Sequence, residues 1–378
     1  MAMVISHSGR GPSMGLQRFG ALGVPAAVIS LVLLASISVA GQTARSAASS
    51  AVAPDKWTAP RTLDGQPDLQ GVWSFANLTP LERPRRLAGK EFFTPEEAVA
   101  FERQTIERNN KDRRDQQPGT TTDVGRAYND FWWDRGTKVA GTRRTSLIIA
   151  PPDGRIPPLT PEARKRAAAR AEFQGRVPGS GPGEEVEDGT QGGVDGRGGR
   201  ADWTTDRSLS ERCILGFNSG PPMLPSAYNN NVQLFQTRDH LVILNEMVHN
   251  ARIVPLDGRP HLPRDLRQWV GDSRCRWEDQ TLVVETTNFT DQTAFRGSGK
   301  NLRLIERFTR TAPDTLVYEF TIDDPASFPQ PWTAQVPMIK SDEKMYEYAC
   351  HEGNYGLHGI LAGARAKEAE EPKQTKTK

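Results

Sequence analysis

Apolar and polar residues alternate with a period of two through much of the region from residue 232 to residue 352. One segment places its apolar residues at every second position, namely Leu316, Tyr318, Phe320 and Ile322. Successive side chains of a β-strand point to opposite faces, so this pattern predicts strands with one buried face. We predict strands with the sequences VQLFQT, HLVILNEMV, ARIVPL, RCRWED, QTLVVETTNF, LRLIERFTRT, DTLVYEFTI, WTAQVPMIK and KMYEYACHE.

Short polar connectors separate these segments, and residues 278–280 and 312–314 are typical of hairpin turns. Residues 241–244 and 282–284 are apolar at every position, which predicts that both faces of these strands are covered. A meander closes naturally when sequence neighbours pair, and closure removes exposed sheet edges. The pattern therefore predicts a mainly β fold in which an antiparallel meander closes into a β-barrel, with a few peripheral helices.

Helix signals are found mainly in the N-terminal half. Residues 94–97, Thr-Pro-Glu-Glu, form a capping box with proline at the first helical position, and they predict a helix that continues through AVAFERQTIERNN. Residues 160–162 predict a second helix, which ends before Gly175. Short strands are predicted at 68–75 and 146–149, and the sequence GILAGARAKEAEE predicts a short helix near the C-terminus.

Composition changes along the chain predict five parts. They are a signal peptide (1–40), a disordered start of the mature chain (41–56), an outer wrapping segment (57–231) with a glycine-rich loop at 175–200, the meander that forms the core (232–364), and a disordered tail (365–378).

The N-terminal segment has the features of a targeting sequence. Arg10 and Arg18 precede the apolar run ALGVPAAVISLVLLASISVA, and residues 38–40 are small enough for cleavage, so the mature chain is expected to begin near Gly41. The alternative is a retained anchor, because the run is nearly long enough to span a bilayer. We predict a periplasmic or secreted protein without stable membrane insertion after cleavage.

Charge and motifs exclude several classes of function. Lysine and arginine total 48 against 46 acidic residues, which leaves a net charge of +2 and no electrostatic footprint for nucleic acid. The chain has no phosphate loop, no dinucleotide fingerprint and no Gly-x-Ser-x-Gly motif, so we predict no cofactor. The expected partner is a small molecule, and the sequence does not indicate an oligomeric state.

Export makes a disulfide possible. The chain has three cysteines, which allows one disulfide and one remaining thiol. We predict that Cys213, which precedes the meander, pairs with Cys350 in the last predicted strand, and that Cys275 is a small buried residue. Because there is no Cys-x-x-Cys motif, we predict no metal site.

Two glutamates occupy apolar surroundings. Glu246 lies in the run LVILNEMV, and Glu306 shares its predicted face with Leu304 and Phe308. A carboxylate on an apolar face must be paired, protonated or functional, so Glu246 and Glu306 are candidate acid and base groups. His351 leaves the last predicted strand for a glycine-rich loop, and it is the third candidate catalytic residue. The alternative is structural, with each glutamate paired to an arginine such as Arg252.

Aromatic and amide side chains supply candidate ligand-binding residues. They are Trp132, Trp133, Tyr228, Asn230, Tyr318 and Tyr348. Aromatic faces stack on sugars and aromatic ligands, although such clusters also serve as core. For the Asn-rich segment at 228–231 the alternative is a turn.

Segments of the sequence resemble two groups of known proteins. Residues 71–73, Gly-Val-Trp, on a first strand before a β meander and a closing helix resemble the lipocalin and calycin pattern, which implies a lipocalin-like β-barrel that holds a small apolar or amphipathic ligand. The segments PDLQGVW, NEMVH, LDGRPH, RWEDQTLVVETTNF and YACHEGNYG are similar to those of a group of exported bacterial β-rich proteins, and this resemblance implies a common fold over most of the mature chain.

Two functions from different classes remain at this point. The first is an exported lipocalin-like barrel that binds a small organic ligand, with aromatic groups at its mouth. The alternative is a secreted hydrolase or lyase, for example one acting on saccharides, that uses barrel carboxylates and a histidine.

Overall fold

The computed structural model describes residues 57–112, 129–173, 203–293 and 295–370. The predicted signal peptide, the start of the mature chain, the whole glycine-rich loop and the end of the tail lie outside the described residues. No helix in the described ranges combines the length and apolar character needed to cross a bilayer.

Ten antiparallel strands form a single sheet, and this confirms the mainly β prediction. The strands are β1 (Gly71–Ser74), β2 (Ile148–Ala150), β3 (Asn231–Gln236), β4 (His240–Asn245), β5 (Ala251–Pro255), β6 (Asp272–Glu278), β7 (Thr281–Thr287), β8 (Arg303–Ala312), β9 (Thr315–Asp323) and β10 (Trp332–Ser341).

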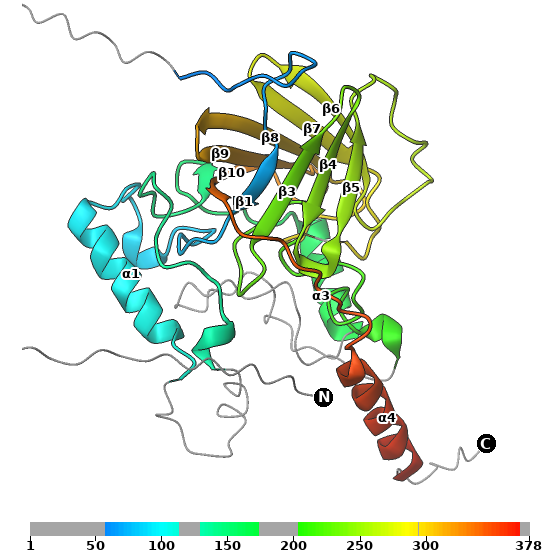
Figure 1. Ribbon diagram of the computed structural model, residues 1–378. Helices are drawn as coiled ribbons and strands as arrows, with labels where there is room; N and C mark the ends of the chain where they lie inside the picture. Colours follow the sequence, from blue (N-terminus) through cyan, green and yellow to red (C-terminus); the bar gives the residue numbers. More distant parts are fainter. Residues whose placement is uncertain (1–56, 113–128, 174–202, 294, 371–378) are drawn as a thin grey trace, which may run out of the picture. The chain divides into compact units, whose positions relative to one another are not determined.

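The strand order is β5-β4-β3-β1-β10-β9-β8-β7-β6, and β2 pairs with β10 beside this path. The strands β3 to β5 form one meander and β6 to β10 form a second (Figure 1). The short strand β1 lies between them, with Trp73 opposite Val232 of β3 and Lys340 of β10. The early Gly-Val-Trp segment therefore joins two meanders that the sequence pattern had suggested were one.

The sheet curls so that its two ends face each other. In a flat sheet the positions of β5 and β8 in this order would lie about 29 Å apart, because neighbouring strands are about 4.8 Å apart. Instead, the Arg252 side chain of β5 bonds directly to Glu306 of β8 at 2.7 Å. The Cys275 thiol of β6 likewise donates to the carbonyl oxygens of Val254 (3.6 Å) and Pro255 (3.4 Å) in β5.

Backbone pairing does not close the sheet. Among the described residues β5 and β6 share no ladder, so the sheet is not closed into a barrel as the sequence had predicted. The loop between these two strands, residues 256–271, is long and contains no strand of its own. Closure of the sheet would require β5 and β6 to pair. The connection between them is not a tight hairpin that would bring their backbones into register.

The inner face of the sheet forms the main core, which we call the interior. Leu304, Phe308, Tyr318, Phe320 and Trp332 are all fully buried there. This confirms the predicted period of two in β8 and β9. The aromatic rings contact one another; for example, the ring centroids of Phe308 and Tyr318 are 5.0 Å apart.

Segments outside the strands cover both ends of the interior. Near the start of β1, the Arg310 guanidinium lies 5.5 Å from the centre of the Trp73 ring and donates to the carbonyl oxygen of Asp68 at 3.0 Å. From the other direction, Met223 and Leu224 join the main core, and the Met223 amide donates to the Tyr318 hydroxyl at 3.1 Å. We call residues 213–230, which carry these two side chains, the plug loop.

In the residues that the structure describes, three α-helices accompany the sheet, namely α1 (Pro95–Asn109), α3 (Pro161–Phe173) and α4 (Tyr355–Glu370). The predicted capping box of α1 is present, since Thr94 accepts from the Glu97 amide and Glu97 accepts from the Thr94 amide. The short 3-10 helices are η1 (Arg85–Leu87), η2 (Asp130–Trp132), η3 (Thr204–Asp206) and η4 (Met247–His249). All three predicted helices are confirmed.

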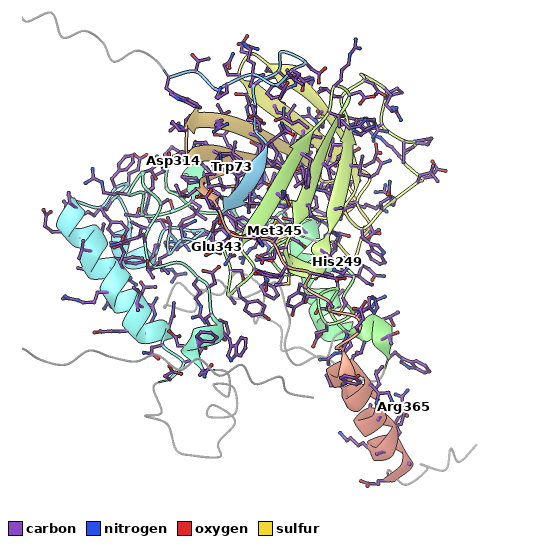
Figure 2. The ribbon with its side chains drawn as sticks, in the orientation of Figure 1. Trp73, His249, Asp314, Glu343, Met345 and Arg365 are labelled. Atoms are coloured by element: carbon purple, nitrogen blue, oxygen red, sulfur yellow. A yellow bond between two sulfur atoms is a disulfide. The ribbon has the colours of Figure 1, made fainter. Side chains whose placement is uncertain are left out.

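The predicted strand KMYEYACHE is wrong. Residues 342–354 form no strand; they leave β10 as an extended segment that we call the strap (Figure 2). Pairing with a neighbouring strand is what makes an extended segment a strand, and the strap has side-chain anchors instead. The predicted disulfide between Cys213 and Cys350 is confirmed, with Cα atoms 5.7 Å apart, and it ties the strap to the plug loop. Cys275 is free and buried.

Candidate functional site

The predicted site residues separate into three groups in the structure. Glu306 and Tyr318 lie in the interior. Trp133, Tyr228, Asn230, Glu246 and Tyr348 gather outside it, around the plug loop and the end of β4. Trp132 and His351 are exposed, and neither contacts the two glutamates.

The interior group is a closed ion pair. Arg252 donates from its two terminal nitrogens to the two oxygens of Glu306, at 2.7 and 2.8 Å, and both side chains are almost completely buried. Tyr318 donates to Glu306 at 2.8 Å. Burial raises the pKa of Tyr318 well above its usual value, and the Glu306 charge raises it further. Bidentate geometry of this kind is among the strongest that arginine makes with a carboxylate.

This arrangement confirms the structural alternative for Glu306. A carboxylate whose oxygens already accept three hydrogen bonds has little capacity to take a proton from a substrate. The pair instead connects strands on opposite sides of the interior. Removing one partner would leave the other buried and unpaired, which is strongly unfavourable.

Glu246 has different surroundings. It follows β4 directly, its amide donates to the Asn231 carbonyl oxygen at 3.0 Å, and its carboxylate accepts from the Asn231 side chain at 2.9 Å. The residue is only 8% exposed, and among the described residues no cation forms an ion pair with it. Burial raises the pKa of Glu246.

Asp134 is the second carboxylate of this group, and its negative charge also raises the pKa of Glu246. The pKa of Asp134 is itself raised, first by partial burial of its carboxyl group and then by the nearby Glu343 of the strap. Asp134 as a whole residue is exposed, so water screens its charge more than that of Glu246. The two negative charges therefore act on each other. The carboxylate of Glu246 is shielded from water, whereas Asp134 is accessible to it.

The side chain of Asn230 links Asp134 to the plug loop through hydrogen bonds. It is fully buried, and its side-chain amide donates to the carbonyl oxygens of Asp134 (2.5 Å) and Ser226 (3.0 Å). Its side-chain oxygen accepts from the Ser226 amide at 2.8 Å and from the Asn218 side chain at 3.2 Å. Asn230 is thus fully engaged by the chain, and its role is to position Asp134 and the plug loop rather than to meet a ligand.

Aromatic rings surround Tyr228. The centroid of its ring lies 5.3 Å from that of Phe217, 6.0 Å from that of Trp133 and 6.3 Å from that of Tyr348. Tyr348 belongs to the strap, and its carbonyl oxygen lies 3.1 Å from the His249 Nδ1 atom. Figure 2 shows His249, Met345 and Glu343 along the path of the strap. We call the group of Trp133, Asp134, Tyr228, Glu246 and Tyr348 the sheet-end site.

The backbone at this site is strained. Asn229, Val248 and His249 all have positive φ angles, of 54°, 59° and 40°. A β-branched residue such as Val248 rarely adopts this conformation, and strain of this kind persists only where the surroundings enforce it. The packing beside this segment is close, because a Cβ atom on Gly216 of the plug loop would lie 2.1 Å from Cγ of Met247.

Sequence reasoning missed Asp134, Phe217 and the strap. Asp134 directly follows the predicted aromatic pair 132–133, so a polar residue beside an aromatic cluster was the available signal. Nothing in the local pattern shows that residues 133–134 reach a loop almost 100 residues later. Among the described residues no cluster of three or more metal-ligating side chains is placed to hold an ion.

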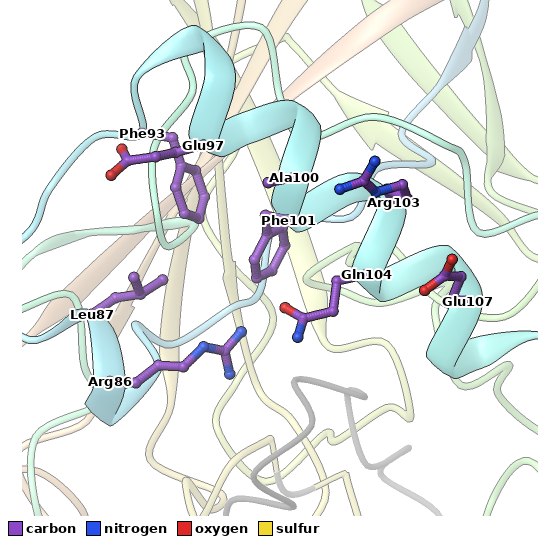
Figure 3. Close-up of a pocket in the computed structure, with 9 residues that line it drawn as sticks. All are labelled: Arg86, Leu87, Phe93, Glu97, Ala100, Phe101, Arg103, Gln104 and Glu107. Carbon is purple, nitrogen blue, oxygen red and sulfur yellow. The ribbon is translucent and has the colours of Figure 1, made fainter.

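A separate groove lies between η1 and α1 (Figure 3). Its volume is about 500 Å³, and its lining residues are Arg86, Leu87, Phe93, Glu97, Ala100, Phe101, Arg103, Gln104 and Glu107. None of the predicted site residues lines it. The groove and the sheet-end site are therefore two distinct places to look for a ligand.

Comparison with known proteins adds no identity. No model of a protein family matches the chain, and no curated protein matches it.

Proposed function

We propose that this protein is an exported binding protein for a small organic ligand, and that the ligand is held at the sheet-end site. The observation that supports this proposal is the contact of Tyr228 with Trp133 and Tyr348, because Asp134 directly follows Trp133 and its charge acts on the buried Glu246. Binding sites for small molecules combine aromatic and apolar walls with a few placed polar groups. The interior is a less suitable place, because aromatic side chains and the Arg252–Glu306 pair occupy it.

The strap supplies one wall of this site. Its Tyr348 ring packs on Tyr228, and the Cys213–Cys350 disulfide fixes its end. A wall fixed in advance lowers the entropy lost on binding, so a rigid strap favours affinity.

A thermal-shift screen with lipids, aromatic compounds and oligosaccharides tests the proposal. A ligand that raises the melting temperature of the wild type should lose most of that effect in Tyr228→Ala and in Tyr348→Ala. The matched control is Tyr346→Ala, since Tyr346 lies on the same strap but is 74% exposed. Equal stabilisation of all four proteins would place the ligand elsewhere and refute the sheet-end assignment.

The alternative is a secreted hydrolase or lyase, and the effect of the Asp134 charge on the buried Glu246 favours it. A carboxyl group with a raised pKa is suited to act as a general acid, and a second carboxylate beside it can act as a base. His351 has no part in this version, since it is exposed and does not contact either group. Turnover of a screened ligand, abolished in Glu246→Gln and strongly reduced in Asp134→Asn, would favour this function. Binding without turnover would leave the first proposal standing.

Export and the lipocalin-like character of the sheet belong to the same proposal. A disulfide indicates a non-cytoplasmic location, because thiols are kept reduced in the cytosol. The curled antiparallel sheet, with Gly71 and Trp73 on its first strand, supports a lipocalin-like wall whose seam between β5 and β6 is held by side chains. N-terminal sequencing of the protein recovered from the periplasm or medium tests export, and we expect a start near Gly41.

A further inference from the structure

The groove between η1 and α1 has an apolar floor. Phe93 and Phe101 lie with their ring centroids 5.0 Å apart, and Leu87 packs beside them. These side chains belong to a small core that is distinct from the interior of the sheet. Figure 3 shows both rings on the side of α1 that faces η1.

The floor is held in place by α1 itself. Glu102, next to Phe101, is buried and accepts hydrogen bonds from the Lys138 side chain and the Val139 amide, both at 3.0 Å. The capping box at Thr94 fixes the other end of the helix. A floor anchored at both ends is preformed, as binding sites for small molecules usually are.

Two arginines give the groove its charge. The Arg86 guanidinium lies 5.8 Å from the centre of the Phe101 ring, and in Figure 3 it extends from η1 toward Gln104. Arg103 of α1 also lines the groove. Neither arginine forms an ion pair with another residue in the described part of the chain.

The acidic lining residues offset this charge only in part. Glu97 forms an ion pair with Lys90 and accepts from the Thr94 amide, so its charge is already matched. Glu107 lies one helical turn beyond Arg103, toward the end of the groove. The centre of the groove, between Arg86 and Gln104, is therefore the place where an added negative charge is best accommodated.

We propose that this groove binds a soluble organic anion with an apolar body, of the class of medium-chain carboxylates. The carboxylate would lie between Arg86 and Arg103, where charge-assisted hydrogen bonds from guanidinium groups are strong. The hydrocarbon part would cover Phe93 and Phe101. The volume of about 500 Å³ lies within the usual range of about 300 to 1,000 Å³ for such sites.

Calorimetric titration of the full chain with decanoate, below its micelle concentration, tests the proposal. Decyltrimethylammonium is the matched amphiphile, since it has a similar chain and the opposite charge. We expect saturable binding of one decanoate per chain and no comparable binding of the cation. In Arg86→Gln/Arg103→Gln the affinity should fall by about tenfold or more, because charge-assisted hydrogen bonds are lost.

Two control variants separate this groove from other causes. Arg164→Gln/Lys165→Gln removes two exposed cations from α3 and should leave decanoate binding unchanged. Tyr348→Ala disturbs the sheet-end site and should also leave it unchanged, so failure of the sheet-end proposal does not affect this one. Equal affinity for the two amphiphiles, or unaltered binding in the double arginine variant, would overturn the proposal. So would arginine-dependent sedimentation with phosphatidylglycerol vesicles in the absence of decanoate binding, since the partner would then be a membrane surface.

Discussion

Two buried glutamates of this protein, Glu246 and Glu306, show how surroundings decide the role of a carboxylate. Glu306 lies in the interior with a bidentate arginine and a tyrosine hydroxyl, so its charge is fully matched. Glu246 lies at the sheet-end site with an asparagine as its hydrogen-bond partner, and burial raises its pKa. The sequence places both residues in apolar surroundings, Glu246 within an apolar run and Glu306 on the apolar face of an alternating strand.

The difference between them follows from what faces each side chain. Glu306 points into the interior, where a strand from the other side of the curled sheet brings Arg252 within reach. Glu246 follows the last residue of β4, where the Asn231 side chain donates to it and Asp134 is the charged group that acts on it. A carboxylate that is paired with an arginine stabilises the fold. A buried carboxylate without a cation can still gain or lose a proton.

The largest expected effect comes from breaking the interior pair. Arg252→Met should lower the free energy of unfolding by about 3 to 5 kcal/mol, because it leaves the Glu306 carboxylate buried and uncompensated. Urea denaturation measures this. The double variant Arg252→Met/Glu306→Met should recover most of the loss, since an apolar pair of similar size leaves no charge behind.

A surface pair supplies the control for that experiment. Arg303 pairs with Glu285 at 2.7 Å, but its side chain is 44% exposed. Arg303→Met should therefore cost less than about 1 kcal/mol. If Arg252→Met were no more harmful than Arg303→Met, the interior pair would not be the structural element described above.

The next effect concerns the strap. Cys213→Ser/Cys350→Ser should lower the free energy of unfolding by roughly 2 to 5 kcal/mol, because the disulfide closes a long loop in the unfolded chain. The two cysteines are 137 residues apart in sequence, which places the loss toward the upper end. Hydrogen exchange should then accelerate in residues 342–354 while the β8–β9 ladder stays protected. Faster exchange in β8 and β9 at the same rate would show that strap and interior unfold as one unit.

The next expected effect is smaller, and it is the contribution of Glu246 to the pH dependence of stability. The pKa of Glu246 is raised in the folded protein, so between its unfolded and folded pKa values the folded state binds more protons than the unfolded state. Stability contributed by this group is present at low pH and falls as the pH rises from about 4. The slope from one group is at most about 1.4 kcal/mol per pH unit.

Replacing the residue removes this slope. We expect the free energy of unfolding of Glu246→Gln to exceed that of the wild type increasingly as the pH rises above about 4, until the wild-type group is fully ionised. Urea denaturation from pH 4 to pH 8 checks this. A difference between the two proteins that stays constant with pH would contradict the raised pKa.

Apart from the Arg303→Met control, the smallest expected effect is that of Tyr348→Ala. Loss of the stacked pair with Tyr228 should cost about 0.5 to 1.5 kcal/mol, because the Tyr348 ring is half-buried and the disulfide still holds the strap. Thermal unfolding measures this loss. A cost near that of Arg252→Met would mean that the sheet-end site, like the interior, is chiefly a structural element.

Strands with a clear period of two were predictable from the sequence. The sequence did not show which strand-like segment would lack a partner and form no strand. The β9 pattern at residues 315–323 gave both the strand and its buried face, since every second side chain is apolar. Residues 344–352 have strand-forming residues too, but no neighbouring strand pairs with them and they form the strap. Secondary structure that depends on a distant partner is not encoded in the local pattern.

The candidate site was predictable in part for the same reason. Trp133, Tyr228, Asn230, Glu246 and Tyr348 were all proposed, each on local grounds, and they come together. The proposal that Glu246, Glu306 and His351 share one cavity finds no support, since Glu306 faces the interior and His351 is exposed. The position of a residue within a strand decides which face of the sheet its side chain is on. It does not decide which residues of a curled sheet lie opposite that side chain.

The sequence alone determined the β class, the helix starts, the disulfide partners and the two glutamates worth testing. These depend on short-range rules, namely the two-residue period, the capping box and the arithmetic of three cysteines. The tertiary structure decided that β1 joins two meanders, that the backbone ladder stays open between β5 and β6, and that only one of the glutamates meets an arginine. Those outcomes depend on contacts between residues tens to hundreds of positions apart, and such contacts are set by how the whole core packs.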